Sequence, residues 1–464
     1  MSQVYAHFIG VGGAGMSGLA RVLHDRGVRV TGSDLRLSRY AAALRECGVD
    51  VHVGHDAANL GDPRVVVISS AIPETNPELA EARRRGLEVW PRARMLAELA
   101  GDQRTIAVAG THGKTSPSSM MAAALMETGH DPTFLIGGEL NDVGSNARCG
   151  RGDYYVVEAD ESDGSFLLLD PYVAVVTNVE ADHLDHYSSL DEIVEAFRAF
   201  LQRVPDDGLG VVCADDLQLG LISGACRGRI VSYGRSRAAD VCLSDYRQEG
   251  RGASFDVDFP DGSRVTCALS VPGEHMALNA TAVLATCWAL GVDTAAASKG
   301  IGAFGGVKRR FEQVGEAQGV TVVDDYAHHP TEVRATLAGA KAAGFRRTWV
   351  VFQPHRYSRT AALGEEFGRS FDDADRVVLM DVYSAGEAPI PGVSGKTVLD
   401  AMLERRPHIA VAYFPHRSDV TDYVAERACS GDLVMTMGAG DVTTVGPELV
   451  RALRERPEGP RPCP

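Results

Sequence analysis

Short runs of apolar residues alternate along most of the chain with stretches whose apolar residues are spaced as in a helix. The apolar runs cover residues 4–9, 28–31, 65–68, 105–109, 154–157, 173–177, 320–323, 348–352, 376–380 and 432–437. Most runs are followed by polar or glycine-rich residues and then by a helical pattern, which is typical of parallel strands joined by helices. The pattern therefore predicts an α/β fold. Residues 209–270 have a mixed pattern that predicts only short strands.

The chain is longer than one hydrophobic core usually supports. Its 464 residues favour about three domains of ordinary size. A helical stretch after Trp90-Pro91 leads into a new strand, and the basic stretch 308–310 opens another α/β pattern. We therefore expect the domain limits 1–99, 100–309 and 310–464.

Charge and cysteine content narrow the classes of function. The net charge of −16 argues against a nucleic-acid-binding surface, although local arginine clusters can still bind anionic ligands. The 9 cysteines show no C-x-x-C pair or zinc spacing, and their odd number indicates no disulfide framework. Reduced thiols in a cytoplasmic protein fit this usage best. We see no apolar run of membrane length and no secretion signal, so we expect no membrane insertion.

The most informative stretch follows the apolar run 105–109. It consists of Gly110, Thr111, His112, Gly113, Lys114 and Thr115. Such a loop directs backbone N–H groups and a helix N-terminus at anionic oxygen, while the lysine adds a charge and the hydroxyl can reach magnesium. The full Walker pattern would place its first glycine at Val108, so this loop is a shorter variant. A plain glycine turn does not explain the Lys-Thr pair, and we predict a site for ATP phosphates.

A second glycine loop follows the first apolar run. Its glycines are Gly10, Gly12, Gly13 and Gly15, and the acidic Asp34 follows about 20 residues later. This arrangement matches the Rossmann fingerprint and by itself would indicate NAD. The glycines guarantee only a close approach to a diphosphate, so other nucleotides remain possible. Ser33 stands beside Asp34, and Ser69 and Ser70 end the run 65–68, although Asp34 and Ser69 fit a cap and a turn equally well.

Acidic residues gather after two of the apolar runs. Glu158, Asp160 and Glu161 follow one run, and Asp182 with His183 follows another. The carboxyl ends of parallel strands share one edge, where ligands bind, and oxygen ligands there suit magnesium. One ion cannot use all of these acids. His183 by itself is more typical of a hydrogen-bonded structural residue than of a ligand for so hard a cation.

Four polar clusters end the runs of the last segment, and we expect them to meet on one rim. The clusters are 324–330, 353–360, 381–387 and 438–441. Arg356 and Arg359 form the best anion clamp in the chain, because paired guanidinium groups grip a carboxylate with two hydrogen bonds each. A solvated helix face is the alternative, but Pro354-His355 forces a turn directly before the pair.

In this order the motifs resemble the Mur ligase family, specifically its alanine-adding branch, over essentially the whole chain. The motifs are HFIGVGGAGMSGLA, AGTHGKT, VVEADESDGSF, TNVEADHLDHY, VKRRFE, DDYAHHPTEVRATL, FQPHRYSRT, DVYSAGEAPIPG and MGAGD. The resemblance implies a Rossmann-like N-terminal domain for the UDP substrate, a central P-loop ATPase-type α/β domain and a Rossmann-like C-terminal domain that closes over the substrates.

The resemblance also implies roles for individual residues. Lys114 would contact the ATP phosphates, and Thr115, Glu158 and His183 would bind magnesium, which reverses our interpretation of His183. Asp325 would contact the ATP ribose. Asn279 and Arg310 are further expected nucleotide contacts. The loop Gly10 to Gly15 would hold the UDP diphosphate, so the NAD interpretation falls. The amino-acid end of the site would contain Tyr326, His328, His355, Arg356 and Arg359.

The implied reaction joins L-alanine to the lactyl carboxylate of UDP-N-acetylmuramate in peptidoglycan synthesis. ATP would convert the carboxylate to an acyl phosphate, and amide formation would leave ADP and phosphate. No lysine occurs from Thr115 to Ser298, so the carbamylated lysine of later-acting family members is excluded. A paralogue with another amino acid or UDP-sugar and a nucleotide-hydrolysing protein without ligase turnover are the alternatives. Whether the protein is a monomer or a homodimer stays open.

Two positions depart from the family pattern. Residues 116–119 read Ser-Pro-Ser-Ser where the family usually has a threonine run, and Met276 follows His275 where it usually has asparagine. Pro117 is tolerated in the first turn of a helix, but it removes one N–H from the loop. Methionine cannot replace both hydrogen bonds of an asparagine amide. We therefore predict a weaker or less selective adenine site.

Overall fold

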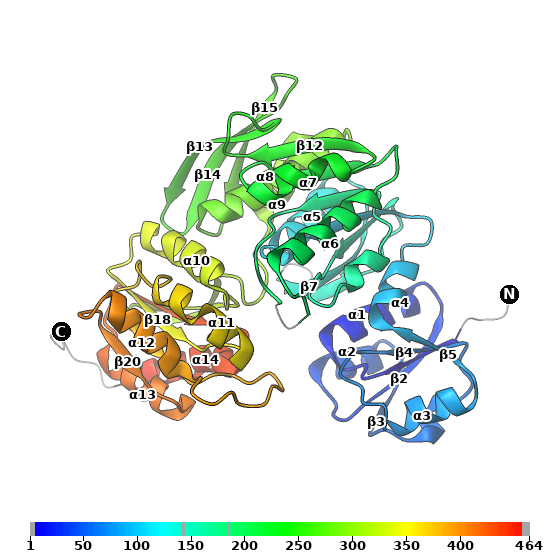
Figure 1. Ribbon diagram of the computed structural model, residues 1–464, viewed down its shortest axis with the longest axis horizontal. Helices are drawn as coiled ribbons and strands as arrows, with labels where there is room; N and C mark the ends of the chain where they lie inside the picture. Colours follow the sequence, from blue (N-terminus) through cyan, green and yellow to red (C-terminus); the bar gives the residue numbers. More distant parts are fainter. Residues whose placement is uncertain (1–4, 142–143, 184–185, 457–464) are drawn as a thin grey trace. The chain divides into compact units, whose positions relative to one another are not determined.

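The computed structural model describes residues 5–141, 144–183 and 186–456 (Figure 1). The chain forms two units: Met1–Glu180, Asp191–Val241 and Ala282–Gly300 make up the first, and the remaining segments make up the second. Helices and strands alternate in three sheet-containing domains, which confirms the predicted three-domain α/β class. The limits 1–99, 100–309 and 310–464 remain a prediction.

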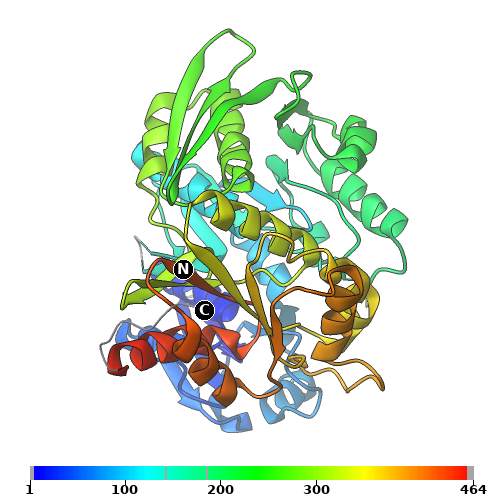
Figure 2. The same ribbon diagram turned by 90° about the vertical axis from the view of Figure 1, so that its left-hand side faces the viewer.

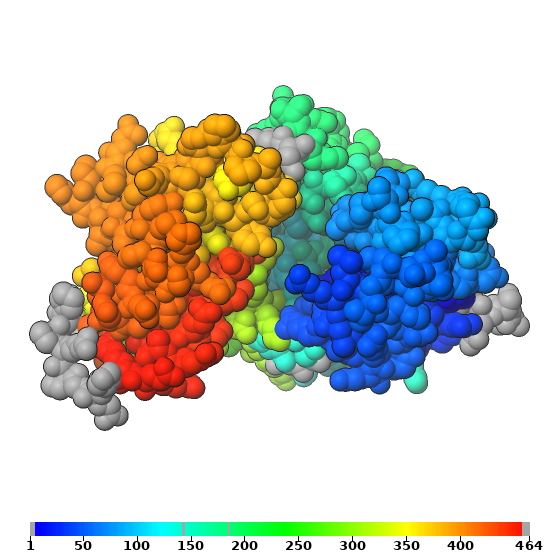
Figure 3. All heavy atoms as spheres, turned by 90° about the horizontal axis from the view of Figure 1, so that it is seen from below, coloured from blue at the N-terminus to red at the C-terminus, as the bar shows by residue number. Residues whose placement is uncertain are grey.

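The N-terminal sheet is parallel and has the order β3-β2-β1-β4-β5. Its elements are β1 (Tyr5–Ile9), α1 (Ala14–Asp25), β2 (Arg29–Asp34), α2 (Arg39–Glu46), β3 (Asp50–Val53), η1 (Ala57–Leu60), β4 (Val65–Ile68), α3 (Pro77–Arg84), β5 (Glu88–Pro91) and α4 (Arg92–Glu98). Strand order reverses between β1 and β4, where open α/β sheets form their ligand crevice. Figure 3 shows one face of this domain in blue.

The glycine loop after β1 is fastened to the end of β2. The amides of Gly10 and Val11 both donate to the carbonyl of Ser33, over 2.8 and 3.0 Å. Strand β2 runs to Asp34, three residues past the predicted run, because its pairing with β3 continues to that residue. Ser33 is therefore inside a buried strand, and its side chain points into a polar network beneath the loop.

This network centres on Glu78 of α3, which is fully buried. One carboxylate oxygen accepts from His7 and Ser33 over 2.9 and 2.6 Å. The other accepts from Asn59 Nδ2 and the Asp56 amide over 3.0 and 3.1 Å. Burial alone would raise the pKa of Glu78, but hydrogen bonds from His7, Ser33 and Asn59 outweigh it and lower the pKa to about 2.

After the N-terminal sheet, seven further strands of the first unit follow along the chain. They have the order β8-β7-β9-β6-β10-β11-β12, and all their pairings except β7 with β8 are parallel. The elements are β6 (Arg104–Ala109), α5 (Thr115–Glu127), β7 (Thr133–Leu140), β8 (Ser145–Arg148), β9 (Tyr154–Glu158), η2 (Ser165–Leu168), β10 (Val173–Val176), α6 (Leu190–Gln202), β11 (Leu209–Cys213), α7 (Leu217–Ile222), η3 (Ser223–Ala225) and β12 (Arg229–Gly234). The central strands are almost entirely buried, as parallel strands covered on both faces are.

Three antiparallel strands and two helices connect this region to the C-terminal sheet. They are β13 (Val241–Glu249), β14 (Gly252–Asp258), β15 (Arg264–Leu269), α8 (Glu274–Ala289) and α9 (Thr294–Ala303). Figure 2 shows the long strands in green. Buried residues alternate with partly buried ones along β14, which is typical of a sheet with one solvated face.

The C-terminal sheet has the order β16-β17-β21-β18-β19-β20, with only β16 antiparallel. Its elements are β16 (Glu312–Ala317), β17 (Val320–Asp325), α10 (Pro330–Ala342), β18 (Arg347–Phe352), α11 (Tyr357–Gly368), β19 (Arg376–Leu379), α12 (Gly395–Arg405), β20 (Val411–Tyr413), α13 (Arg417–Arg427), β21 (Asp432–Met437), η4 (Asp441–Thr444) and α14 (Val445–Glu455). Strand β17 extends past the predicted run to Asp325 because it stays paired with β21.

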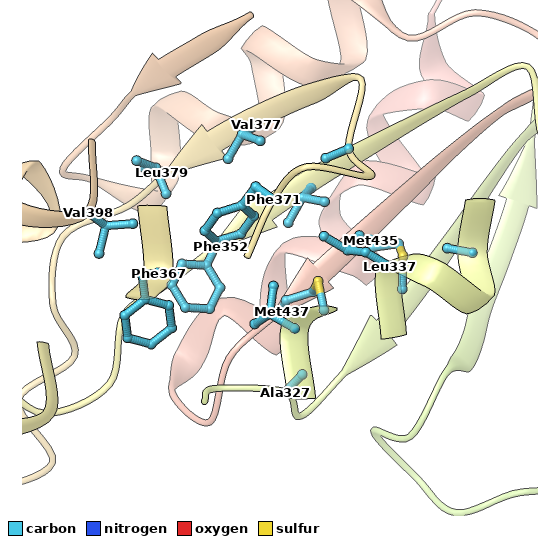
Figure 4. Packing of buried hydrophobic residues seen from close by; sticks show 14 of the residues in the cluster. Ala327, Leu337, Phe352, Phe367, Phe371, Val377, Leu379, Val398, Met435 and Met437 are labelled. Carbon is cyan, nitrogen blue, oxygen red and sulfur yellow. The ribbon is translucent and has the colours of Figure 1, made fainter. Parts of the chain in front are cut away.

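Helices cover both faces of this sheet. Alternate residues of β18 enter different cores: Phe352 packs with Phe367 and Phe371 on one face, and Trp349 packs on the other. Figure 4 shows the three phenylalanine rings together; the Phe352 centroid lies 5.3 Å from that of Phe367 and 5.2 Å from that of Phe371. Because helices cover both faces of the sheet, the polar loops lie at the carboxyl ends of the parallel strands.

Seven of the described cysteines are free thiols, as expected. Within the ranges that the structure describes, we find no helix with both the length and the apolar character needed to cross a membrane.

The buried carboxylate of Glu78 predicts a specific loss of stability on substitution. Glu78→Gln should destabilise the protein by about 3 kcal/mol at pH 7, because the buried donors of His7, Ser33 and Asn59 lose their charged acceptor. The folded-state pKa lies below the reference value of 4.5, so the carboxylate contributes stability above that value and loses it as pH falls towards about 2. The difference in unfolding free energy between the wild type and Glu78→Gln, measured by urea unfolding, should therefore shrink as the pH falls through this range. Glu74→Gln on the exposed Glu74 is the control, and an equal deficit in it would contradict the prediction.

Candidate active site

The loop between β6 and α5 is built around Gly110, whose φ of +141° suits only glycine. A Cβ at this position would overlap the Thr177 hydroxyl. Residues after β10 hold the loop from the other side: the Thr111 amide donates to Asn178 O over 3.1 Å and the His112 amide to Asn178 Oδ1 over 2.9 Å. The loop is thus fixed by backbone geometry before any ligand binds.

Lys114 is turned onto its own loop in this structure. Its Nζ donates to the carbonyls of Gly110 and Thr111 over 2.8 and 3.2 Å, and to the two oxygens of Glu161 over 2.9 and 2.7 Å. Burial would lower the pKa of Lys114, but the charges of Glu161, Asp160 and Glu158 together outweigh it and raise the pKa. The lysine is therefore a largely buried ammonium paired with a buried carboxylate.

Helix α5 accommodates Pro117 without losing a hydrogen bond. Lys114 is the N-cap and Pro117 the third helical residue. Amides in the first turn have no intrahelical acceptor, so proline removes none of the helix bonds. The expected first-turn position is confirmed, and an effect on ATP affinity stays a prediction.

The carboxylate of Glu158 lies beside the loop because of strand register. Glu158 ends β9 opposite Val108 of β6. Thr115 Oγ1 donates to Glu158 Oε1 over 3.2 Å, and the Gly137 amide donates to Oε2 over 2.9 Å. A Cβ on Gly137 would lie 2.7 Å from Oε2, so only glycine allows this approach. The structure thus brings two of the three predicted magnesium ligands together.

Gly137 is a site residue that the sequence reasoning missed. The Gly137-Gly138 pair inside β7 was the available signal, because glycine within a strand often marks a close approach of backbone to another group. Gly137 also lines a cavity of about 100 Å³ in the first unit. The lining residues are Gly15, Arg92, Leu96, Leu135, Ile136, Gly137, Glu158 and Asp160. This cavity joins the predicted UDP loop, through Gly15, to the predicted metal ligand Glu158.

The other predicted UDP-site residues differ in what they offer to a ligand. Asp34 accepts from the Gly12 amide over 2.9 Å and so holds the loop in shape. Ser33 is fully buried and its hydroxyl donates to Glu78, so its side chain supports the loop, and its expected ligand contact stays a prediction. Ser69 and Ser70 follow β4 and lie partly or fully exposed, and a Cβ on Gly10 would be 3.7 Å from Ser69 Oγ. Gly13 is exposed on the same loop.

In the second unit, the carboxylate of Asp182 binds the edge of the Arg359 guanidinium that carries Nε and Nη2. Arg359 Nε and Nη2 donate to Asp182 over 3.2, 3.0 and 3.1 Å, and both side chains are buried. Burial raises the pKa of Asp182, but the Arg359 charge together with His183 and His329 outweighs it and lowers the pKa well below its usual range. The predicted two-armed grip of Arg359 on a ligand stays a prediction: in this structure that edge binds the protein's own carboxylate, and Nη1 lies 3.5 Å from His355 Nδ1.

Arg356 has a carboxylate of its own nearby. It is the N-cap of α11 with a φ of +68°, and its Nη1 lies 3.8 Å from Glu387 Oε1. Glu387 also accepts from the amide and hydroxyl of Ser358 over 3.0 and 2.6 Å. Arg356, Arg359 and His183 line one pocket of about 210 Å³. The turn predicted at this position therefore does bring both arginines to one cavity.

His183 adjoins this pocket in a strained backbone conformation. Its φ is +53°, and its amide donates to Asp182 Oδ1 over 2.8 Å. A non-glycine residue in the left-handed region costs energy and is often found at functional sites. His183 belongs to the second unit, whereas Thr115 and Glu158 belong to the first.

The loops after the C-terminal strands meet, as predicted. The His328 ring centroid lies 5.2 Å from that of Tyr326 and 5.7 Å from that of His355, which stacks on Tyr383. Burial lowers the pKa of His328 to about 3 and that of His355 to about 4, and the charge of Arg359 adds to the effect in both. Both imidazoles are therefore neutral at physiological pH.

The predicted nucleotide contacts of the second unit are mostly buried. Asp325 accepts from the amides of Ala327 and Phe311, each over 2.8 Å, and burial raises its pKa to about 6. Arg310 stacks over Tyr326 at 5.1 Å and lies 3.7 Å from Glu332. On α8, Asn279 and Met276 are 9% and 7% exposed. Asp325 thus shapes the 309–311 turn, and its expected ribose contact stays a prediction.

Three family models match successive parts of the chain. Residues 5–104 match the Mur ligase family catalytic domain, residues 108–287 the Mur ligase middle domain, and residues 309–440 the Mur ligase glutamate ligase domain. Together they span most of the chain in the order predicted from the motifs.

Individual relatives agree with this result. UDP-N-acetylmuramate--L-alanine ligase of Geotalea daltonii is 47% identical over 97% of this chain and 98% of its own length, and that of Acidothermus cellulolyticus is 50% identical over 98% and 96%. The crystal structure of UDP-N-acetylmuramate-alanine ligase MurC from Thermotoga maritima aligns with a TM-score of 0.81 and 28% identity over 97% of this chain and 99% of its own. The chain belongs to the Mur ligase family.

Proposed function

We propose that this protein joins L-alanine to the lactyl carboxylate of UDP-N-acetylmuramate at the expense of ATP, forming ADP and phosphate for peptidoglycan synthesis in the cytoplasm. The observation that carries the proposal is the full-length similarity to relatives at 47 to 50% identity that bear this one name. The glycine loop with Lys114, next to Glu158 and the cavity that reaches Gly15, supports it with a geometry suited to phosphate and carboxylate chemistry.

The first step needs charge compensation, and no protein nucleophile. The substrate carboxylate attacks the γ-phosphorus of ATP, ADP leaves, and an acyl phosphate remains on the substrate. Amides of the Gly110–Gly113 loop and the N-terminus of α5 would hold phosphate oxygens, and Lys114 would offset their charge. The rigid loop provides these donors without reorganisation at the moment of reaction.

Magnesium fits the residues around this loop. The Thr115 hydroxyl and the Glu158 carboxylate are hard oxygen donors 3.2 Å apart, which suits an ion that keeps phosphate and water as its other ligands. When bound, the ion would offset negative charge on the phosphates. His183 is our third proposed ligand. The Gly137 amide fixes the second oxygen of Glu158 and thereby the direction of the first.

The second step forms the amide. The amine of L-alanine attacks the activated carbonyl carbon and phosphate leaves. We propose that Arg356 and the Nη1 of Arg359 orient the acid group of the amino acid in the pocket that they share. Neutral His328 and His355 would contact the amino acid without repelling the arginines or adding positive charge beside the amine.

Phosphate release from ATP distinguishes the candidate functions. Our proposal predicts release that requires both UDP-N-acetylmuramate and L-alanine, with a UDP-N-acetylmuramyl-alanine product seen by mass spectrometry. Release without either substrate would indicate a hydrolase, and NADH turnover without release would indicate an oxidoreductase. Glycine and L-serine in place of L-alanine, and other UDP-sugars, test for a paralogue.

Gly137→Ala tests the role of Glu158 without touching its charge. The added methyl would push the carboxylate away from Thr115, so we expect kcat/KM to fall on the order of 100-fold and the magnesium concentration for half-maximal activity to rise. Gly220→Ala is the matched control, because a Cβ on Gly220 meets open space in α7. Unchanged magnesium dependence in Gly137→Ala would contradict the assignment of Glu158.

A further inference from the structure

All hydrogen-bond donors of Lys114 are used inside the protein. An ammonium has three N–H groups. In this structure they face the Gly110 carbonyl, the Thr111 carbonyl and the carboxylate of Glu161. A phosphate can therefore bind Nζ only if one of these acceptors gives way.

Of the three acceptors of Lys114, Glu161 costs the most free energy to replace by a phosphate. Its contact at 2.7 and 2.9 Å pairs the ammonium with an opposite charge, whereas the two carbonyl acceptors carry no net charge. The residue is 1% exposed, so water cannot solvate its carboxylate when the lysine turns away. Moving Lys114 from Glu161 to a phosphate therefore costs free energy. This cost offsets part of the attraction between the lysine and the phosphate.

We propose that Glu161 is a positioning residue that occupies Lys114 in the nucleotide-free protein and competes with the phosphates for it. Glu161 thereby weakens nucleotide binding. Its ion pair with Lys114 persists until phosphates replace the carboxylate as the partner of the lysine. The inference rests on the proposed function only in that the displacing anion belongs to ATP.

A purely structural role for Glu161 predicts the opposite sign. If the carboxylate only stabilises the loop, its loss distorts the loop and weakens nucleotide binding. If it competes with phosphate, its loss leaves Lys114 available and strengthens binding. The direction of the change in affinity therefore separates the two roles, and catalytic turnover is not needed to observe it.

Glu161→Gln is the decisive variant, with MgATP and adenosine as probes in isothermal titration. We expect MgATP to bind roughly tenfold more tightly than to the wild type, and adenosine, which lacks phosphate, to bind equally. Asp163→Asn is the matched control, because it removes the same charge from an exposed residue two positions away and should leave both affinities unchanged. Unchanged or weaker MgATP binding in Glu161→Gln, or equal tightening in the control, would overturn the inference.

Thermal unfolding provides a second readout on the same proteins. Saturating MgATP should raise the Tm of Glu161→Gln by more than that of the wild type, since tighter binding to the folded state gives a larger shift. If Glu161→Gln does not fold, Glu161→Asp tests the same point, because its carboxylate withdraws from Nζ by one methylene. Binding no tighter than wild type in that variant overturns the inference. A wild-type protein that binds no MgATP would instead overturn the ATP-dependent function itself.

Discussion

The parallel pairing of β6 with β9 and β10 fixes where the chemistry of the first unit can occur. Backbone hydrogen bonds place Glu158 level with Val108, two residues before Gly110, and place Thr177 directly against the turn. A slip of one residue would reverse the side chains of β9 and remove the carboxylate from the loop. Register is strongly specified because these strands are buried on both faces. The phosphate loop and its neighbouring acid are therefore consequences of one buried sheet.

Internal carboxylates pair with the cations that were expected to bind anionic ligands. Lys114 binds Glu161, Arg359 binds Asp182, and Arg356 lies near Glu387. Burying Lys114 or Arg359 without an opposite charge would cost several kcal/mol, so a partner within the fold is required whenever substrate is absent. The ligands must then compete with, or add to, contacts that already exist. This explains how each unit keeps these positive groups in place without bound anions.

Sequence patterns predicted the buried central strands and the polar loops that follow them, but not the outer strands β3, β5, β7, β8, β16 and β20. Buried parallel strands have long apolar runs, and glycines at Gly10 and Gly110 mark turns that only glycine adopts. Patterns were insufficient where a contact depends on residues distant along the chain. Nothing near Arg359 in the sequence shows that Asp182 binds it, and the bond of Ser33 to Glu78 is equally invisible locally. Gly137 escaped notice because β7, the strand that contains it, was not predicted.

An isotope transfer would show whether the substrate carboxylate is phosphorylated before the amide forms. UDP-N-acetylmuramate labelled with ¹⁸O in its lactyl carboxylate would be incubated with the protein, ATP, magnesium and L-alanine. If an acyl phosphate forms, each turnover carries one labelled oxygen into the released phosphate, because the bond between that oxygen and carbon breaks when the amine attacks. Amide product accompanied by phosphate without ¹⁸O would contradict the account.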